Sequence, residues 1–238
     1  GPPGLVELTL RRHDARAERT RDRHDERYGA HSEFQRVDKL EEPTFVQDAL
    51  EALGRVPLAP GARVLHVGVG SGNELRLLDL AYPGHALDVV GIDVSASALD
   101  LARTRFPRAR FERVDANDLP DASLGRFDLI VCLSVLQSPG VDLDPVLRAL
   151  RREHLAPGGS LLLGFPNGRY EGGRLTYGAR LVNFRRPDLS LLVRDVAHVR
   201  RHLQKHDFRV FVTGRYEVLV TAVPVRAGNS EAPATIPG

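Results

Sequence analysis

The sequence predicts an α/β fold in which helices cover both faces of a mostly parallel, seven-stranded sheet. From Arg63 onward, apolar runs of strand length alternate with turns and with segments of helical period. This alternation is typical of a parallel sheet wrapped by helices. A glycine-rich turn follows the first apolar run, as it does in many such folds. The last two apolar runs are separated by only a few residues, so they are expected to form an antiparallel hairpin.

Each element of this fold is expected from its own local pattern. Strands are predicted over residues 63–67, 87–92, 110–114, 127–132 and 160–165, and the helices between them over 73–81, 97–104 and 145–153. A further helix over 192–206 leads into two final strands at 208–213 and 217–223. These segments complete the predicted sheet.

The chain divides into three parts by composition. Residues 1–60 are expected to form an N-terminal helical cap, because 11–40 mix charges of both signs and Pro43 opens an amphipathic helix that stops at Gly54. Residues 61–223 form the main domain, with an arginine-rich insertion at about 168–190. The tail at 224–238 has little to bury and is expected to be disordered.

Composition excludes several classes of protein. Of 238 residues, 42% are hydrophobic and 27% charged, which is ordinary for a globular domain and unlike a fibre or a disordered chain. No apolar run approaches the length of a membrane helix, and the N-terminus does not resemble a signal peptide. Cys132 is the single cysteine, which excludes an intramolecular disulfide and favours a cytoplasmic location.

The strongest functional signal is the turn after the first strand, which carries Gly68, Gly70 and Gly72. Glycines let the backbone turn sharply and let a ligand approach without meeting a Cβ atom. A tight turn without a ligand would also explain the glycines alone. About 20 residues later, however, Asp93 ends the second strand, where a carboxylate can bind ribose hydroxyls. The two features together predict a site for a ribose-bearing cofactor.

The spacing of the glycines distinguishes between cofactors. A dinucleotide site would need its third glycine at position 73 or 75, which hold Asn73 and Leu75. The observed spacing instead resembles the first motif of the class I S-adenosylmethionine (SAM)-dependent methyltransferase family, which has a Rossmann-like fold. Later segments resemble further motifs of that family in order and spacing, at residues 91–95, 114–120, 127–131 and 155–160. The resemblance runs from about Arg63 to Val223.

The resemblance implies SAM as the cofactor and gives roles to individual residues. The three glycines would line the methionine part, Asp93 would accept the ribose hydroxyls, and Asp115 with the Ala116 amide would read the adenine edge. Cys132 is interpreted as a core thiol beside the cofactor rather than a nucleophile. The full implied set is His66, Gly68, Val69, Gly70, Gly72, Asp93, Val94, Asp115, Ala116, Cys132 and Leu133.

His66 departs from the family pattern. The family usually has an acidic residue at this position, two residues before the first glycine. A neutral imidazole accepts one hydrogen bond but supplies no negative charge for a cationic ligand. We therefore expect weakened cofactor binding, or a core histidine that is satisfied by neighbouring backbone.

Residues for the acceptor are less evident. The segment Leu133 to Gln137 after the fourth strand lacks the Asn-Pro-Pro-Tyr pattern of methyltransferases that act on adenine or glutamine amino groups. Gln137 is a candidate substrate contact and a poor base, and methyl transfer needs mainly an aligned nucleophile. No catalytic base and no metal-ligand set are predicted. Further substrate candidates, each with packing as its alternative role, are Tyr28, His31, Tyr170 and Tyr177.

The distribution of charge suggests the chemistry of the acceptor. The net charge is +2, yet residues 169–215 alone carry 11 basic and 4 acidic groups. Arg180, Arg185 and Arg186 follow the fifth strand, and arginine matches carboxylate and phosphate groups bidentately. A solvated basic face is the alternative. Aromatic residues are few, at 6%, so a surface that stacks single-stranded RNA is poorly supported.

The sequence therefore predicts a SAM-dependent methyltransferase whose partner is a small, anionic acceptor molecule and not a membrane. The alternatives are an RNA methyltransferase, or a non-catalytic SAM-binding or nucleic-acid-binding module on the same fold. An enzyme that uses NAD or a nucleotide sugar is a weaker third option.

Overall fold

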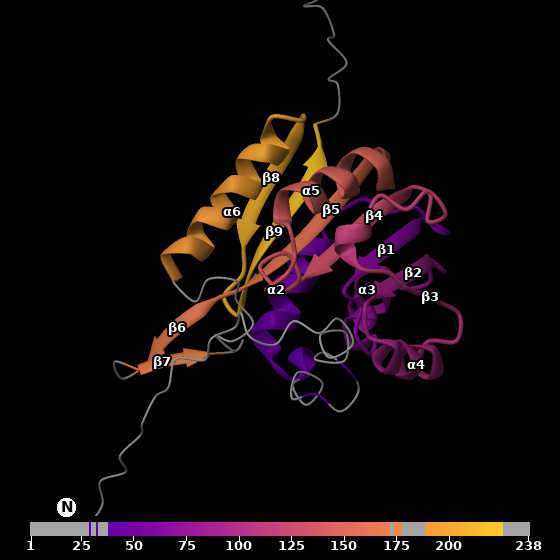
Figure 1. The fold of residues 1–238 in the computed structure, drawn as a ribbon, viewed down its shortest axis with the longest axis horizontal. Coiled ribbons are helices and arrows are strands. Elements are labelled where there is room, and N and C mark those ends of the chain that lie inside the picture. Colours follow the sequence, from indigo (N-terminus) through magenta and orange to yellow (C-terminus); the bar gives the residue numbers. More distant parts are fainter. Residues whose placement is uncertain (1–28, 30–31, 33–37, 172–173, 178–188, 226–238) are drawn as a thin grey trace, which may run out of the picture.

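The computed structural model describes residues 29, 32, 38–171, 174–177 and 189–225. Strands β1 (Arg63–Val67), β2 (Asp88–Asp93), β3 (Arg110–Arg113), β4 (Phe127–Leu133), β5 (Leu155–Pro166), β8 (Phe208–Thr213) and β9 (Glu217–Pro224) form one sheet. Their order is β3-β2-β1-β4-β5-β9-β8 (Figure 1). The pairs from β3 across to β5 are parallel, and β9 runs antiparallel to both β5 and β8. The predicted fold class is confirmed.

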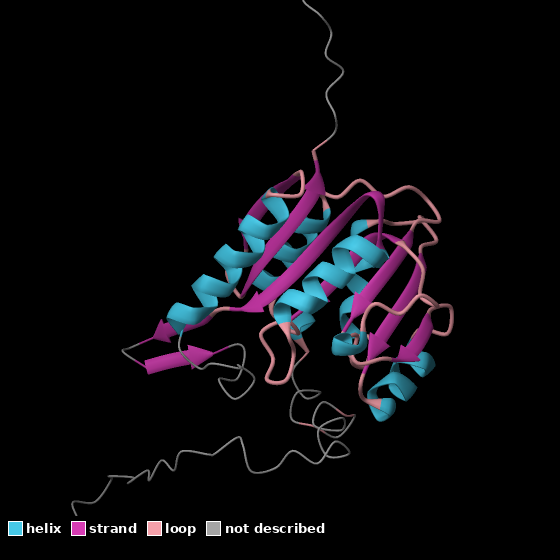
Figure 2. Cartoon of the chain, turned by 45° about the horizontal axis from the view of Figure 1, so that its top comes forward, coloured by secondary structure: helices cyan, strands magenta, loops and turns pink. Residues whose placement is uncertain are grey.

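Helices cover both faces of this sheet (Figure 2). On one face, α2 (Pro43–Leu53), α3 (Arg76–Ala81) and α4 (Ala96–Arg105) contribute Phe45, Leu78 and Leu99 to one buried cluster. On the other face, α5 (Leu143–Ala149) and α6 (Leu189–Gln204) contribute Leu147 and Val199 to a second cluster. Neighbouring residues of β1 enter different clusters, as the alternation of side chains along a strand requires.

The ends of α2 show how local chemistry fixes this helix. Pro43 occupies the first turn, where its missing N–H would have no helical partner, and the Glu42 side chain accepts a hydrogen bond from the Thr44 amide. Gly54 caps the other end. The helix predicted from Pro43 to Gly54 is therefore confirmed.

Several elements differ from their predicted ranges, among them α6, which begins at Leu189 instead of Leu192. Strand β5 begins at Leu155 instead of Ser160. Helix α5 begins at Leu143, because Pro145 fits in a first turn, and a π-helical turn, η6 (Leu150–His154), follows it. The helix expected over 73–81 begins as a 3-10 turn, η4 (Asn73–Leu75), before α3.

The insertion contains a short hairpin that the sequence did not indicate. Strands β6 (Gly168–Glu171) and β7 (Arg174–Tyr177) pair antiparallel and extend beyond the end of β5 (Figure 1). The segment is polar and lacks a clear alternation of apolar residues, so its pairing was not evident from pattern.

Parts of the predicted organisation lie outside the described residues. These are most of the charged segment at 11–40 and the tail from residue 226, so the division into cap, domain and tail stays a prediction. Within the described part, none of the helices combines the length and the apolar character that crossing a bilayer requires.

Candidate functional site

The glycine turn follows β1 directly and is tied to β2. Gly68, Gly70 and Gly72 have φ angles of 67°, 54° and 84°, in the left-handed region that favours glycine. A Cβ atom on Gly68 would lie 2.2 Å from Val135 Cγ2, so this position also has no room for a side chain. The Gly68 amide donates a hydrogen bond to the Ile92 carbonyl at 2.8 Å. The turn is therefore held at the carboxyl ends of β1 and β2.

Asp93 ends β2, and its carboxylate is fixed by two backbone amides. Oδ2 accepts from the Gly70 amide at 2.9 Å, and Oδ1 accepts from the Ser95 amide at 2.9 Å. A carboxylate oxygen has two lone pairs and can accept more than one hydrogen bond. Ser95 also caps α4, since its Oγ accepts from the Ala98 amide at 3.1 Å. The orientation of Asp93 is thus built into the turn and the start of α4.

Asp115 and Ala116 lie at the same edge of the sheet. The Val114 amide donates to the Asp93 carbonyl at 3.1 Å, which brings the end of β3 beside β2. Asp115 Oδ1 accepts from the Asn117 amide at 2.9 Å and caps a short turn, η5 (Ala116–Asp118). The Val94 carbonyl accepts from Arg113 Nε at 2.9 Å in the same region. The predicted ribose and adenine residues are therefore brought together.

The residues predicted on β4 and just after it are buried. Cys132 and Leu133 are 0% and 3% exposed, and Cys132 pairs with Val67 of β1. Burial raises the pKa of the Cys132 thiol to about 12, so the thiol is neutral and packs in the core. Gln137 is 2% exposed, and its Nε2 donates to the Ser134 carbonyl at 2.8 Å. Gln137 thus faces the protein interior.

The structure gives no geometry for the other predicted substrate residues. Tyr28, His31 and Arg180 lie outside the described residues. Tyr170 and Tyr177 belong to β6 and β7, but their side chains also lie outside the described part. Their roles stay predictions.

A buried charge cluster lies at the same edge of the sheet. It consists of Lys39, His66, Glu74, Ser134 and Glu217. Lys39 Nζ is 2.8 Å from both Glu74 Oε1 and Glu217 Oε1 and donates to Ser134 Oγ at 3.1 Å. His66 Nε2 lies 3.8 Å from Glu74 Oε2. Of these residues, the sequence indicated only His66.

One feature of the sequence could have drawn attention to Lys39. It is one of only two lysines in a chain whose other basic residues, histidine aside, are arginines. An ammonium group is a compact charge that can serve several acceptors at once, unlike the planar guanidinium. The partners of Lys39 are far away in the chain, so the sequence gave no indication of the ion pairs.

Burial sets the charges in this cluster. His66 is 1% exposed, and its burial lowers its pKa. The attraction of Glu74 opposes this effect, and the weaker repulsion of Lys39 adds to it. Burial raises the pKa of Glu74, but Lys39, and to a smaller extent His66, lower it by more than burial raises it. The pKa of Glu74 therefore lies below its usual value. Burial lowers the pKa of Lys39, but Glu217 and Glu74 raise it by more. The cluster therefore combines a neutral imidazole, an ammonium and two carboxylates.

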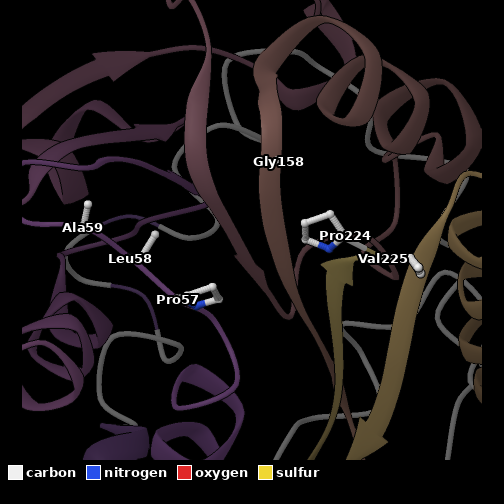
Figure 3. A pocket seen from close by; sticks show the side chains of 6 residues that line it. All are labelled: Pro57, Leu58, Ala59, Gly158, Pro224 and Val225. Atoms are coloured by element: carbon white, nitrogen blue, oxygen red, sulfur yellow. The ribbon is translucent and has the colours of Figure 1, made fainter. Parts of the chain in front are cut away.

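A depression at the other end of the parallel strands, away from the glycine turn, is a poor candidate for a catalytic site. It has a volume of about 640 Å³ and is lined by Pro57, Leu58, Ala59, Gly158, Pro224 and Val225 (Figure 3). None of these side chains titrates or donates a hydrogen bond. Among the described residues, no three His, Cys, Asp or Glu side chains are placed to hold a metal ion.

The strand order, the glycine turn and the acidic end of β2 together define a class I methyltransferase fold. Residues 65–161 match the family model described as a methyltransferase domain. This part of the chain therefore belongs to the class I SAM-dependent methyltransferase family, as the motifs indicated.

Two curated relatives each match about half of this chain. The chain is 36% identical over 128 residues to the trans-aconitate 2-methyltransferase of Paracidovorax citrulli, covering 54% of this chain and 48% of the relative. It is 41% identical over 126 residues to the trans-aconitate 2-methyltransferase of Variovorax paradoxus, covering 52% and 46%. The chain thus matches about half the length of these relatives.

Solved structures support the fold. A SAM-dependent methyltransferase from Aquifex aeolicus superposes with a TM-score of 0.55 at 20% identity, covering 79% of this chain and 96% of that one. A chain from the complex between the Haloferax volcanii Trm112 methyltransferase activator and the putative methyltransferase superposes with a TM-score of 0.53 at 19% identity. The match covers 79% of this chain and 93% of that one. At these identities the likeness concerns the fold alone.

Proposed function

We propose that the protein is a SAM-dependent methyltransferase that methylates a carboxylate of a small, anionic metabolite. The observation that carries the proposal is the glycine turn joined to Asp93 at the carboxyl edge of the sheet, within a methyltransferase domain. The acceptor class is supported by the similarity to trans-aconitate 2-methyltransferases.

The residues at this edge fit the proposed cofactor. When bound, SAM supplies an electrophilic methyl group on a sulfonium. Gly70 carries no side chain, which suits close approach of the methionine part, whereas the space beside Gly68 is filled by Val135. Asp93 ends β2 with a carboxylate that suits the ribose hydroxyls. Asp115 and the Ala116 amide follow the neighbouring strand β3 and suit the adenine edge. The donors and acceptors that this chain presents match those of the nucleoside.

A carboxylate acceptor needs no catalytic base from the protein. A carboxylic acid is ionised at neutral pH, so it is already the nucleophile and needs no proton removed. The protein then has to orient the acceptor and exclude water, which contributes much of the rate in such reactions. A methyl relay through Cys132 is disfavoured, because its thiol is buried and neutral.

The proposal is tested by supplying SAM with a labelled methyl group to trans-aconitate and to a panel of other small di- and tricarboxylates. We expect a labelled methyl ester, detected by mass spectrometry, from one of these acids. At SAM concentrations below the wild-type dissociation constant, an Asp93→Ala variant should form much less of it. Binding of SAM without transfer to any carboxylate would refute the acceptor class. An absence of SAM binding in calorimetry would refute the whole proposal.

An RNA acceptor is the second candidate. It is favoured by the exposed residues Arg194, Arg200, Arg201 and Lys205 on and just after α6. Binding to RNA would weaken steeply with salt, with a slope of log affinity against log salt of about −0.7 per phosphate neutralised. A metabolite with a few carboxylates would show a shallow slope, so the salt dependence of acceptor binding separates the two candidates.

A further inference from the structure

The buried charge cluster has an excess of negative charge. Glu74 and Glu217 are carboxylates, Lys39 is the only ammonium that contacts them among the described residues, and the burial of His66 favours its neutral form. The cluster therefore carries one negative charge more than its cation balances. Buried charge of this kind is costly unless a partner compensates it.

The unpaired atoms in and beside the cluster are mostly hydrogen-bond acceptors. Lys39 directs its three donors at Glu74, Glu217 and Ser134. Glu217 Oε2, Gln137 Oε1 and both ring nitrogens of His66 are buried without a hydrogen-bond partner in the described part of the chain. A neutral imidazole offers one acceptor nitrogen. A ligand that brings positive charge and several N–H donors would satisfy this site.

Glu74 is the carboxylate that such a ligand can reach. Its side chain is 16% exposed, whereas that of Glu217 is 2% exposed. Glu74 Oε2 lies 3.8 Å from His66 Nε2, beyond hydrogen-bonding distance, while Oε1 is held by Lys39. Glu74 also stands two residues after Gly72, in the 3-10 turn that continues the glycine turn. One oxygen is thus anchored by Lys39, and the carboxylate stands directly beside the glycine turn.

We propose that Glu74 receives the α-ammonium group of SAM, replacing the negative charge that β1 lacks at His66. The inference rests on the proposed function. In this arrangement Lys39 orients the Glu74 carboxylate and keeps it ionised, and His66 fills the space beneath it. The charge needed by the cofactor is supplied from the first helical turn instead of the strand.

The test measures by calorimetry the affinities of two ligands whose sulfur atom carries no charge. S-adenosylhomocysteine carries the α-ammonium, and 5′-methylthioadenosine lacks the whole amino-acid part. Glu74→Gln should reduce the affinity ratio of the first ligand over the second by about tenfold or more, the loss expected when a charged hydrogen bond is removed. The matched control is Asp79→Asn, which removes one exposed negative charge from α3 and should leave the ratio unchanged.

A second variant decides the case even if Glu74→Gln folds poorly. His66→Asp with Glu74→Gln returns the carboxylate to the strand end, and the affinity ratio should recover to within about threefold of the wild-type value, well inside the tenfold loss above. His66→Asp alone places a carboxylate beside Glu74 and should weaken folding, because buried like charges repel. A full recovery in the double variant supports the inference.

Three outcomes would overturn the inference in different ways. If Glu74→Gln weakens both ligands equally, Glu74 acts only in folding. If it lowers the ratio but the double variant does not restore it, Glu74 does not replace a charge at the end of β1, and the inference fails. If the wild-type protein binds neither ligand nor SAM, the proposed function itself fails and takes the inference with it.

Discussion

Lys39 and Glu217 lie 178 positions apart in the chain, yet Lys39 Nζ and Glu217 Oε1 are 2.8 Å apart. Lys39 begins a short turn, η3 (Lys39–Glu41), just before α2, and Glu217 begins β9. Glu217 is 2% exposed and Lys39 21%. The ion pair therefore fastens the segment before α2 to the start of β9, and Glu74 joins the same ammonium group from the turn that follows the glycines.

Replacing Lys39 by methionine should destabilise the protein by about 3–5 kcal/mol, the usual cost of leaving a buried charge uncompensated. Two carboxylates, Glu74 and Glu217, would lose their common cation. The free energy of unfolding in urea measures this loss. Lys205→Met is the control, since Lys205 is exposed and its loss should change stability by no more than about 0.5 kcal/mol. A loss below 1 kcal/mol for Lys39→Met, on that same scale, would contradict the assignment.

Replacing Gly68 by alanine should cost about 2–5 kcal/mol, because a left-handed φ adds about 1–2 kcal/mol and an overpacked contact about 1–3 kcal/mol. The new Cβ atom would meet Val135 Cγ2 at 2.2 Å. Gly61→Ala is the matched control, since Gly61 has a φ of 75° with no atom near its Cβ position. Val135→Ala combined with Gly68→Ala should recover the steric part. Equal losses in Gly68→Ala and Gly61→Ala, measured by thermal unfolding, would argue against the clash.

Much of the sheet could be predicted from local sequence. The bounds of β1 and β8 agree with the predicted ranges, because each is an apolar or alternating run between turn residues. The glycine turn and Asp93 were equally visible, since their positions relative to two strands are encoded within 26 residues. The features that could be predicted are all local ones: a strand, the turn after it and the residue that ends the strand.

The buried charge cluster could not be predicted in this way. Lys39, Glu74 and Glu217 meet only after the sheet has formed, and no periodicity relates their positions. From the sequence alone, each of these residues would be expected at the surface, where lysine and glutamate side chains usually lie. The predicted start of β5 at Ser160 differs from the observed start at Leu155 because the pairing with β4 shifts register between Phe127 and Leu129, and regular pairing resumes at Ser160.

Replacing Asp93 by alanine should lower the affinity for S-adenosylhomocysteine by at least about tenfold, through loss of charge-assisted hydrogen bonds to the ribose. The amides of Gly70 and Ser95 also lose their acceptor, so stability should fall by about 1–3 kcal/mol. Calorimetry and thermal unfolding measure the two effects. Asp100→Asn, an exposed change on α4, should alter neither. Normal affinity in Asp93→Ala would show that the ribose binds elsewhere.

His66 should make the stability of the protein depend on pH. Burial lowers the pKa of His66 below its ordinary value of 6.5, so below pH 6.5 the unfolded chain binds a proton that the folded chain does not. The contribution of His66 is therefore complete above pH 6.5 and is lost as the pH falls, by up to about 1.4 kcal/mol per pH unit.

A His66→Gln variant isolates this effect, because His202 and His206 also have lowered pKa values, chiefly from burial, and contribute in the same direction to both proteins. The difference in unfolding free energy between wild type and variant, measured in urea from pH 7.5 to about pH 5, should shrink or change sign as the pH falls. The glutamine side chain does not titrate, so any cost of fitting it in the core is a constant offset. Parallel stability curves would mean that His66 takes up its proton in the folded protein. In that case Glu74 would have a cationic partner on β1, and the excess of negative charge in the cluster would disappear.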